Sequence, residues 1–152
     1  MLTILNADLD DARIADLLST HARLALGAAR CRVGHALDVD ALRSLDIEVW
    51  AIWLNDGPVG VGALRRLSPS DGELKSMYVV DAARGRGIGA RLLAHLIESA
   101  RRQGLQRLFL ETGASDYFAA ARSLYASAGF SPCDAFADMP PHPDSCFMSR
   151  PI

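Results

Sequence analysis

A glycine-rich segment with two arginines is the part of this sequence best suited to binding an anion. Arg84-Gly85-Arg86-Gly87-Ile88-Gly89 follows a predicted strand and opens a predicted helix. A loop in that position presents unpaired backbone N–H groups and the positive end of the helix dipole. Its glycines allow a phosphate to approach the backbone, and its arginines suit a multiply phosphorylated ligand. The segment is therefore predicted to bind a phosphate-bearing ligand rather than to serve only as a helix-capping turn.

Two common nucleotide motifs compete for this segment. A Walker P-loop needs GxxxxGK followed by serine or threonine, and that lysine and hydroxyl are absent here, so ATP hydrolysis is disfavoured. The dinucleotide fingerprint is a stronger rival, because Gly85, Gly87 and Ala90 fit its relaxed GxGxxA form. Glu111 also ends the next predicted strand. That fingerprint normally opens the first βα unit, whereas a long stretch with a hairpin precedes it here, so nicotinamide binding is the weaker alternative.

The same segment resembles the R/Q-x-x-G-x-G/A motif of the GCN5-related N-acetyltransferases, the GNAT family. It follows the strand-forming run from Leu74 to Val80, where the family places a strand. Downstream, Ala121-x-x-Leu124-Tyr125-x-x-x-Gly129-Phe130 resembles the family ending A-x-x-L-Y-x-x-x-G-F. The order of predicted elements agrees over the whole chain, and the resemblance extends in detail to small bacterial YsnE-like acetyltransferases. It implies an α+β, three-layer fold with about four helices around a mixed, mostly antiparallel central sheet.

The resemblance also implies acetyl-CoA as a co-substrate and direct attack by an amine in a ternary complex. Backbone groups on the strand would align the pantetheine arm and the acetyl carbonyl, and loop N–H groups would hold the pyrophosphate. Tyr125 matches the family tyrosine that protonates the leaving thiolate. Many relatives have asparagine seven residues before that tyrosine, but this chain has Phe118, so no cofactor hydrogen bond is predicted there. The predicted cofactor-binding residues are Met77, Tyr78, Val79, Arg84, Gly85, Arg86, Gly87, Ile88, Gly89 and Ala90.

Acetyl transfer also needs a neutral amine, and therefore a group that accepts its proton. Glu73 is the first candidate, because a carboxylate at the cleft end of the central strand could act directly or through water. Two alternatives stay open: Glu73 pairs with a lysine or arginine, or it anchors the substrate ammonium without accepting a proton. Glu111 is the second candidate and a predicted substrate contact. His35, with Arg32, lies in the inter-helix segment where the family usually forms its acceptor pocket, so it is predicted to touch the acceptor.

Neither a metal site nor a disulfide framework is expected. The histidines lack the spacing of metal ligands and are interpreted as surface or core residues, except that His35 is also the predicted acceptor contact: His21, His35, His95 and His142. The cysteines are odd in number, widely spaced and without a CxxC pair, which favours small buried hydrophobes: Cys31, Cys133 and Cys146.

Hydrophobic periodicity and turn residues predict the elements that position these groups. Asp8 is expected to cap a helix with Ile14, Leu17 and Leu18 on its apolar face, and a second helical stretch is expected at 38–45. Asn55-Asp56-Gly57 predicts a tight reversal between two antiparallel strands. The predicted strands are 2–6, 48–54, 59–67, 73–80 and 107–111, with two short strands near 130–138 and 146–150. Two later helices are predicted from Ile88 to the terminating Gly104 and over 119–128.

Length and composition suit one domain over residues 1–152. Half of the residues are apolar, 22% are charged and the formal net charge is −2, so no broad positive field exists for a nucleic-acid backbone. No basic leader with an apolar stretch opens the chain, and no run approaches membrane-spanning length. We therefore expect a cytoplasmic protein without nucleic-acid or membrane partners. The resemblance also admits a homodimer, because relatives are often dimers.

The leading hypothesis is an acetyl-CoA-dependent N-acetyltransferase that acts on the primary amine of a small molecule. Retention of both Glu73 and Tyr125 favours this enzyme over a non-catalytic coenzyme A-binding module or sensor of the same fold. A dinucleotide-binding protein ranks third. Acceptor specificity would come from residues 20–45 and 140–145.

Overall fold

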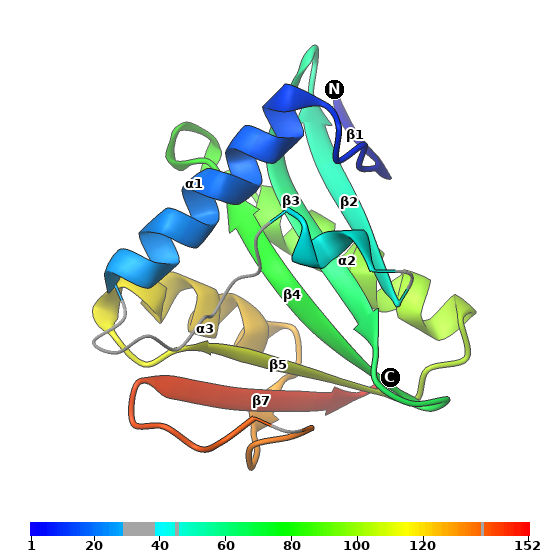
Figure 1. Cartoon of the computed structure of the whole chain (residues 1–152), viewed down its shortest axis with the longest axis vertical. Helices are drawn as coiled ribbons and strands as arrows, with labels where there is room; N and C mark the ends of the chain where they lie inside the picture. Colours follow the sequence, from blue (N-terminus) through cyan, green and yellow to red (C-terminus); the bar gives the residue numbers. More distant parts are fainter. Residues whose placement is uncertain (29–38, 45, 138) are drawn as a thin grey trace.

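A seven-stranded mixed sheet forms the centre of the molecule (Figure 1). The computed structural model describes residues 1–28, 39–44, 46–137 and 139–152. Neighbouring strands are antiparallel except β4 and β5, which are parallel. This confirms the predicted α+β fold. In spatial order the strands are β1 (Leu2–Asn6), β2 (Ile47–Leu54), β3 (Gly57–Arg66), β4 (Asp71–Val79), β5 (Arg107–Gly113), β7 (Ser145–Pro151) and β6 (Ser131–Pro132).

Helices cover both faces of the sheet and give three layers. α1 (Ala12–Ala28) crosses one face, whereas α2 (Ile88–Arg102) and α3 (Ala119–Ser127) lie against the other (Figure 1). The described residues also form three short 3-10 helices: η1 (Ala41–Arg43), η2 (Asp81–Ala83) and η3 (Asp116–Phe118). The prediction of a fourth helix at 38–45 is wrong for the described part of that stretch, which forms only the single turn η1.

Two hydrophobic cores fill the spaces between the layers. Under α1, Ile14 and Leu18 are almost fully buried and pack against the sheet. On the opposite face, Leu92 and Leu96 of α2 are fully buried in the larger core. Each such side chain contributes about 2 kcal/mol through removal of apolar surface from water. The helical spacing of these residues had predicted both buried faces.

The start of α1 differs from the prediction in its capping residue. The Asp11 carboxylate accepts a hydrogen bond of 2.9 Å from the backbone N–H of Arg13, and the Asp11 carbonyl accepts one from Ala15. Asp11 therefore caps the helix. Asp8 lies before the helix, and its carboxylate accepts a hydrogen bond of 2.9 Å from the backbone N–H of Asp10.

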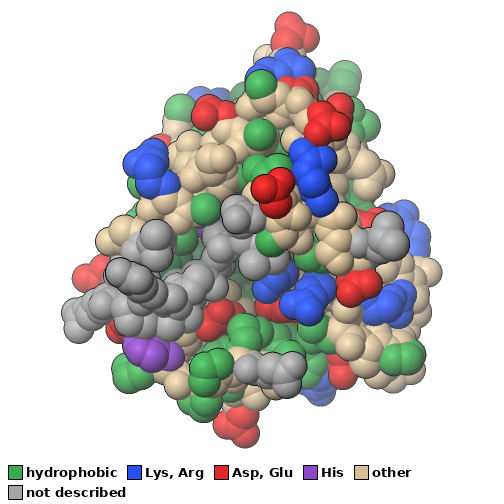
Figure 2. Space-filling view, in the orientation of Figure 1, with side chains coloured by type: hydrophobic (Ala, Val, Ile, Leu, Met, Phe, Trp, Pro, Cys, Tyr) green, Lys and Arg blue, Asp and Glu red, His purple; other side chains and the backbone are tan. Residues whose placement is uncertain are grey.

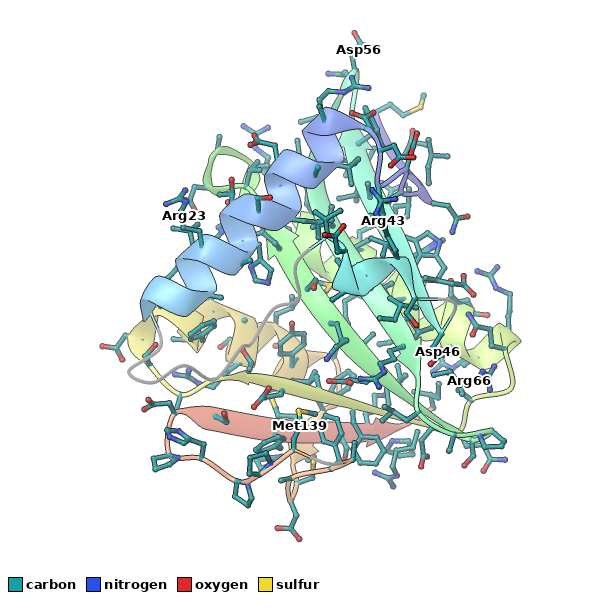
Figure 3. All side chains as sticks on the ribbon, in the orientation of Figure 1. Arg23, Arg43, Asp46, Asp56, Arg66 and Met139 are labelled. Carbon is teal, nitrogen blue, oxygen red and sulfur yellow. The ribbon has the colours of Figure 1, made fainter. Side chains whose placement is uncertain are left out.

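The predicted hairpin is confirmed in β2 and β3. Asn55 in its turn adopts a positive φ of 55°, a conformation that asparagine tolerates better than most residues. At the end of β3, Arg66 donates hydrogen bonds to the carbonyl oxygens of Pro69 at 3.2 Å and Gln103 at 3.1 Å (Figure 3). The hairpin is thereby joined to the residue that follows α2.

A bulge in β4 opens the central sheet. Val61 of β3 pairs with Tyr78, but Ala63, two residues on, pairs with Lys75, so β4 contains one extra residue in this interval. Ser76 lies within it and has a positive φ of 56°. The parallel pairing of β4 with β5 ends at Leu74, and beyond that point the two strands spread apart (Figure 1). Beyond this point, Met77, Tyr78 and Val79 of β4 line a cavity with residues of both sequence motifs.

On the α1 side, the described residues at the surface carry charges of both signs. Figure 2 shows acidic and basic side chains interspersed over this face. None of the helices in the described ranges combines the length and the apolar character that crossing a membrane requires.

Candidate active site

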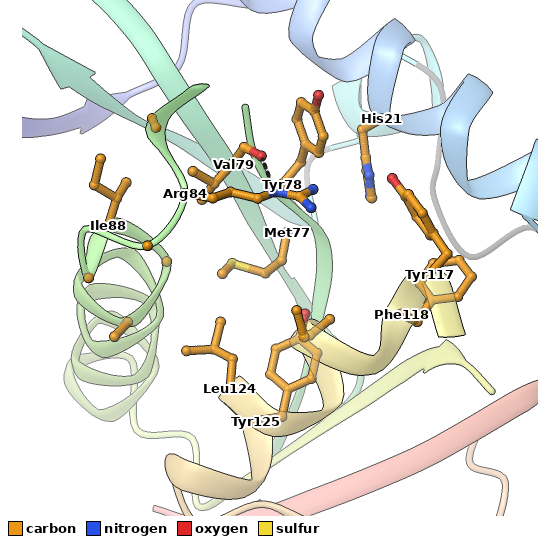
Figure 4. Close-up of a pocket in the computed structure, with 17 residues that line it drawn as sticks. His21, Met77, Tyr78, Val79, Arg84, Ile88, Tyr117, Phe118, Leu124 and Tyr125 are labelled. Atoms are coloured by element: carbon orange, nitrogen blue, oxygen red, sulfur yellow. Dashed lines mark hydrogen bonds between the residues drawn. The ribbon is translucent and has the colours of Figure 1, made fainter. Parts of the chain in front are cut away.

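A cavity of about 300 Å³ lies beside the diverging end of β4 (Figure 4). Its walls come from β4, the loop before α2, the first turn of α2, α3, α1 and η3. The structure thus brings the glycine-rich motif and the tyrosine motif, far apart in sequence, to one cavity. The predicted residues that line it are Met77, Tyr78, Val79, Arg84, Gly85, Gly87, Ile88, Gly89, Ala90 and Tyr125.

The glycine-rich loop has the conformation that its glycines suggest. Gly85 and Gly87 have φ values of 77° and 76°, a left-handed region that favours glycine. Gly89 acts differently, because an added Cβ there would make a tight contact, 3.3 Å, with the Leu124 side chain of α3. The first two glycines therefore shape the loop, whereas the third lets α2 and α3 approach each other.

The backbone donors of this loop are available to a ligand. The N–H of Arg84 donates to the carbonyl of Asp81, and the N–H of Arg91 donates to that of Gly87. Between them, the N–H groups from Gly85 to Ala90 donate to no protein acceptor among the described residues. Such unpaired donors at a helix start favour an anion.

The two arginines of the loop are placed differently. The Arg84 side chain folds over the end of β4, where its Nε donates to the Val79 carbonyl at 3.1 Å and lies 3.3 Å from the Asp81 carboxylate (Figure 4). Arg86 is exposed and does not line the cavity. Positive charge is therefore present at the cavity through Arg84, and Arg86 adds charge only from outside.

Tyr125 lies in α3 with 6% of its surface exposed. Its ring packs edge-on against Phe130, with 6.0 Å between centroids. Burial raises the pKa of the phenol above its ordinary value, so the hydroxyl keeps its proton at neutral pH. The residue can therefore donate a proton or a hydrogen bond into the cavity that it lines.

Glu73 lies outside the cavity lining. Its side chain is buried, and one carboxylate oxygen is 2.8 Å from the ammonium of Lys75, whose side chain is 15% exposed. The other oxygen, Oε1, is buried and has no hydrogen-bond partner among the described residues. The alternative in which Glu73 pairs with a lysine thus describes this arrangement.

The remaining predicted residues are separated from the cavity lining or fall outside the described chain. Glu111, in β5, is half-buried and is not among the lining residues. His35, Arg32 and Cys31 lie outside the described residues. Cys133 and Cys146 are free thiols and half-buried, which corrects the expectation that they are buried hydrophobes.

Seven lining residues were not identified as site residues from the sequence: His21, Ala83, Tyr117, Phe118, Ala120, Ala121 and Leu124. His21 is 8% exposed and stacks on Tyr78, with 5.2 Å between ring centroids. It follows Leu18 by three residues, so helical spacing could have placed it on the buried face of α1. Tyr117 and Phe118 have no comparable signal, because a short 3-10 turn carries them.

Arg122 and Gly113 hold that turn in place. Arg122 Nη1 donates to the carbonyl oxygens of Gly113 at 2.7 Å and Ser115 at 2.8 Å. A Cβ on Gly113 would overlap the ring of Phe118. The glycine therefore permits Phe118 to pack against the end of β5, and the arginine fixes the turn that presents Tyr117.

Sequence comparison places the chain among known proteins. Residues 22–130 match the model of the Acetyltransferase (GNAT) family. The chain is 36% identical over 145 residues to the uncharacterized N-acetyltransferase YsnE of Bacillus subtilis (strain 168). The aligned region covers 95% of this chain and 96% of YsnE. The chain is also 38% identical over 119 residues to an IAA acetyltransferase of Azospirillum brasilense, and this aligned region covers 78% of this chain and 76% of that protein.

Comparison with solved structures finds the same fold in acyltransferases. A Klebsiella pneumoniae protein assigned as an acyl-CoA N-acyltransferase has a TM-score of 0.84 and 32% identity, with 99% of this chain and 97% of that chain covered. A GNAT acetyltransferase from Elizabethkingia anophelis with acetyl-CoA bound shares the fold, with a TM-score of 0.73, 20% identity and coverage of 99% and 98%. Fold and site together define an acyltransferase that uses an acyl-CoA. The chain belongs to the Acetyltransferase (GNAT) family and is an N-acetyltransferase.

The described residues contain no group of three or more His, Cys, Asp or Glu side chains placed to hold a metal ion.

Proposed function

We propose that this enzyme transfers the acetyl group of acetyl-CoA to the primary amine of a small molecule, by direct attack in a ternary complex. The main support is the run of backbone N–H groups from Gly85 to Ala90, which have no protein acceptor among the described residues. A diphosphate offers several acceptor oxygens to such a run. Arg84 can add a charge-assisted hydrogen bond if its side chain turns from the Val79 carbonyl toward the phosphates.

The open end of β4 supports the proposed position of the pantetheine arm. Pairing with β5 ends at Leu74, so the following stretch of β4 has no strand partner on that side among the described residues. The amides of the pantetheine arm can pair with main-chain groups of Met77 to Val79, as a short added strand would. This would direct the thioester along β4 toward Tyr125.

The proton balance assigns a role to Tyr125. The amine nitrogen forms a bond to the acetyl carbon, the carbon–sulfur bond breaks, and the sulfur takes a proton from the phenol. Because burial raises the pKa of this phenol, the proton must be replaced as it leaves. The acetylated nitrogen has a proton to lose, and its transfer to the phenolate restores Tyr125.

For Glu73 the surroundings favour an electrostatic role. One carboxylate oxygen of Glu73 is held in an ion pair of 2.8 Å with the Lys75 ammonium, and Glu73 does not line the cavity. We propose that Glu73 holds Lys75 at the base of the gap between β4 and β5. Contact of Glu111 and His35 with the substrate stays a prediction.

Binding and turnover test this function in two steps. Calorimetric titration should show acetyl-CoA binding, with no comparable heat for NAD or NADP; binding of a nicotinamide dinucleotide instead would favour the third hypothesis. Release of free thiol from acetyl-CoA is then measured over a panel of primary amines. Binding without release for any amine would support the non-catalytic coenzyme A-binding module.

Two glycines at opposite ends of α2 provide a matched test of the phosphate cradle. Gly87 and Gly104 have φ values of 76° and 81°, and an added Cβ would meet nothing within 4 Å at either position. Gly87→Ala and Gly104→Ala should therefore cost similar stability, about 1–2 kcal/mol each. Only Gly87→Ala should weaken acetyl-CoA binding, by roughly 10-fold or more, because its methyl group and altered backbone disturb the donors. Equal affinities in the two variants would contradict the cradle.

A further inference from the structure

One side of the cavity is built from aromatic rings. His21 projects from α1, Tyr78 comes from β4, and Tyr117 with Phe118 comes from η3 (Figure 4). In that view these rings lie across the cavity from Ile88 and the glycine-rich loop. The imidazole of His21 stacks on Tyr78 with an interplanar angle of 24°, and Tyr117 meets Phe118 edge-on at 4.8 Å. This side can hold a flat apolar group.

The imidazole of His21 has a hydrogen-bonding atom that the fold does not use. Its Nδ1 is buried and has no partner among the described residues. Buried polar atoms without partners are uncommon, and each needs an explanation, such as a functional role or a bound molecule that supplies the partner. A neutral imidazole offers one acceptor and one donor nitrogen, so it can accept a hydrogen bond from an amine N–H.

The electrostatics of this side disfavour a cation. No Asp or Glu is among the described residues that line the cavity, whereas Arg84 contributes a guanidinium. Asp81, outside the lining, is paired with Arg84. Burial, and secondarily the Arg84 charge, lowers the pKa of His21 to about 4, so the ring is neutral at physiological pH. A substrate ammonium at this position would likewise lose contact with water and lie near the Arg84 guanidinium, and both effects disfavour a positive charge.

We propose that His21, Tyr78 and Tyr117 form the acceptor subsite, and that it selects a weakly basic, uncharged primary amine on a flat apolar body, an arylamine in the simplest case. His21 accepts a hydrogen bond from the amine and directs its lone pair at the thioester. This assignment rests on the proposed function and names the substrate class for the same site. An arylamine arrives neutral, so no carboxylate is needed to take a proton before attack.

Substrate preference tests the assignment in the unmodified enzyme. Ring-matched anilines and benzylamines are compared as acceptors at neutral pH, with kcat/KM measured from thiol release. Anilines should be preferred by at least about 10-fold, a difference of about 1.4 kcal/mol in transition-state binding. A preference for benzylamines would overturn the subsite assignment while leaving the proposed acetyltransferase function intact. Loss of acetyl-CoA binding, or no transfer to any amine, would instead mean that the proposed function itself is wrong.

Two variants of His21 separate its hydrogen bond from its packing. His21→Phe keeps an aromatic ring on Tyr78 but removes the acceptor, so aniline kcat/KM should fall about 10-fold with acetyl-CoA affinity unchanged. His21→Gln retains an acceptor oxygen and should recover part of this loss. His95→Phe, against Trp50 and outside the cavity lining, is the control and should behave like the unmodified enzyme. Unchanged aniline kinetics in His21→Phe, or a loss of acetyl-CoA affinity, would overturn the assignment.

Discussion

Acid sensitivity of the fold should depend on His21. The imidazole extends from α1 toward β4 and is 8% exposed; titratable residues that line the same cavity, among those described, include Tyr78, Arg84 and Tyr117. Burial, followed by the charge of Arg84, lowers its pKa from 6.5 to about 4 in the folded chain. The unfolded chain therefore binds the proton more tightly. The stability that the neutral ring contributes is complete above about pH 6.5 and is lost as the pH falls toward about 4.

The magnitude follows from the two pKa values. Each unit between 6.5 and about 4 corresponds to about 1.4 kcal/mol, so protonation in the unfolded state should lower the free energy of unfolding by about 3 kcal/mol. His21→Phe cannot take up this proton. The unfolding free energy of the unmodified chain, measured relative to that of the variant, should therefore fall by about 3 kcal/mol from about pH 7 to about pH 4.

Urea denaturation followed by tryptophan fluorescence measures this difference, because Trp50 is 6% exposed in the core. Other titrating groups are common to both proteins and cancel. His95→Phe is the matched control: the pKa of His95 is also lowered by burial, but less of that ring is buried, so its pH dependence should be smaller. Parallel stability curves for the unmodified chain and His21→Phe would refute the account of His21 as a buried neutral ring.

Three further changes test other contacts. Tyr125→Phe should lower kcat about 100-fold in the thiol-release assay and leave calorimetric acetyl-CoA affinity unchanged; retained turnover would remove the proton-donor role. Glu73→Gln should cost about 3 kcal/mol in urea denaturation, because the Lys75 ammonium loses its partner, and adding Lys75→Met should recover part of it; additive losses would show that the pair is not coupled. Gly113→Ala should cost about 2 kcal/mol by displacing Phe118, whereas Gly57→Ala, with open space around its Cβ, should cost less; equal costs would argue against that packing.

Short-range patterns were enough to predict much of the fold. The hairpin around Asn55 and the amphipathic α2 depend on backbone preference and side-chain spacing within a few residues, so a single sequence carries the information. The same holds for Gly85 and Gly87, whose positive φ values are properties of the loop itself. The predicted anion loop and Tyr125 therefore line the cavity, as the two motifs indicated.

The bulge at Ser76 decided the environment of Glu73. In a regular strand, residues 73, 75, 77 and 79 would share one face of the sheet. The extra residue reverses the alternation, so Met77 and Val79 pack with the core under α2, whereas Tyr78 packs on the α1 side. Glu73 and Lys75 precede the bulge and share the face opposite Leu74, where they form their ion pair, so the bulge leaves Glu73 on a different face from Met77 and Val79. No local pattern in this sequence signals that inserted residue.

The sequence by itself determined the glycine-rich loop, the helix that carries Tyr125 and most strands, because their signals lie in neighbouring residues. Only the tertiary structure decided which side chains share the cavity. His21 enters it because α1 crosses β4, and Tyr117 enters it because Arg122 fixes η3. Both placements depend on packing between segments that are far apart in the chain, and the aromatic side of the site exists only once the sheet has assembled.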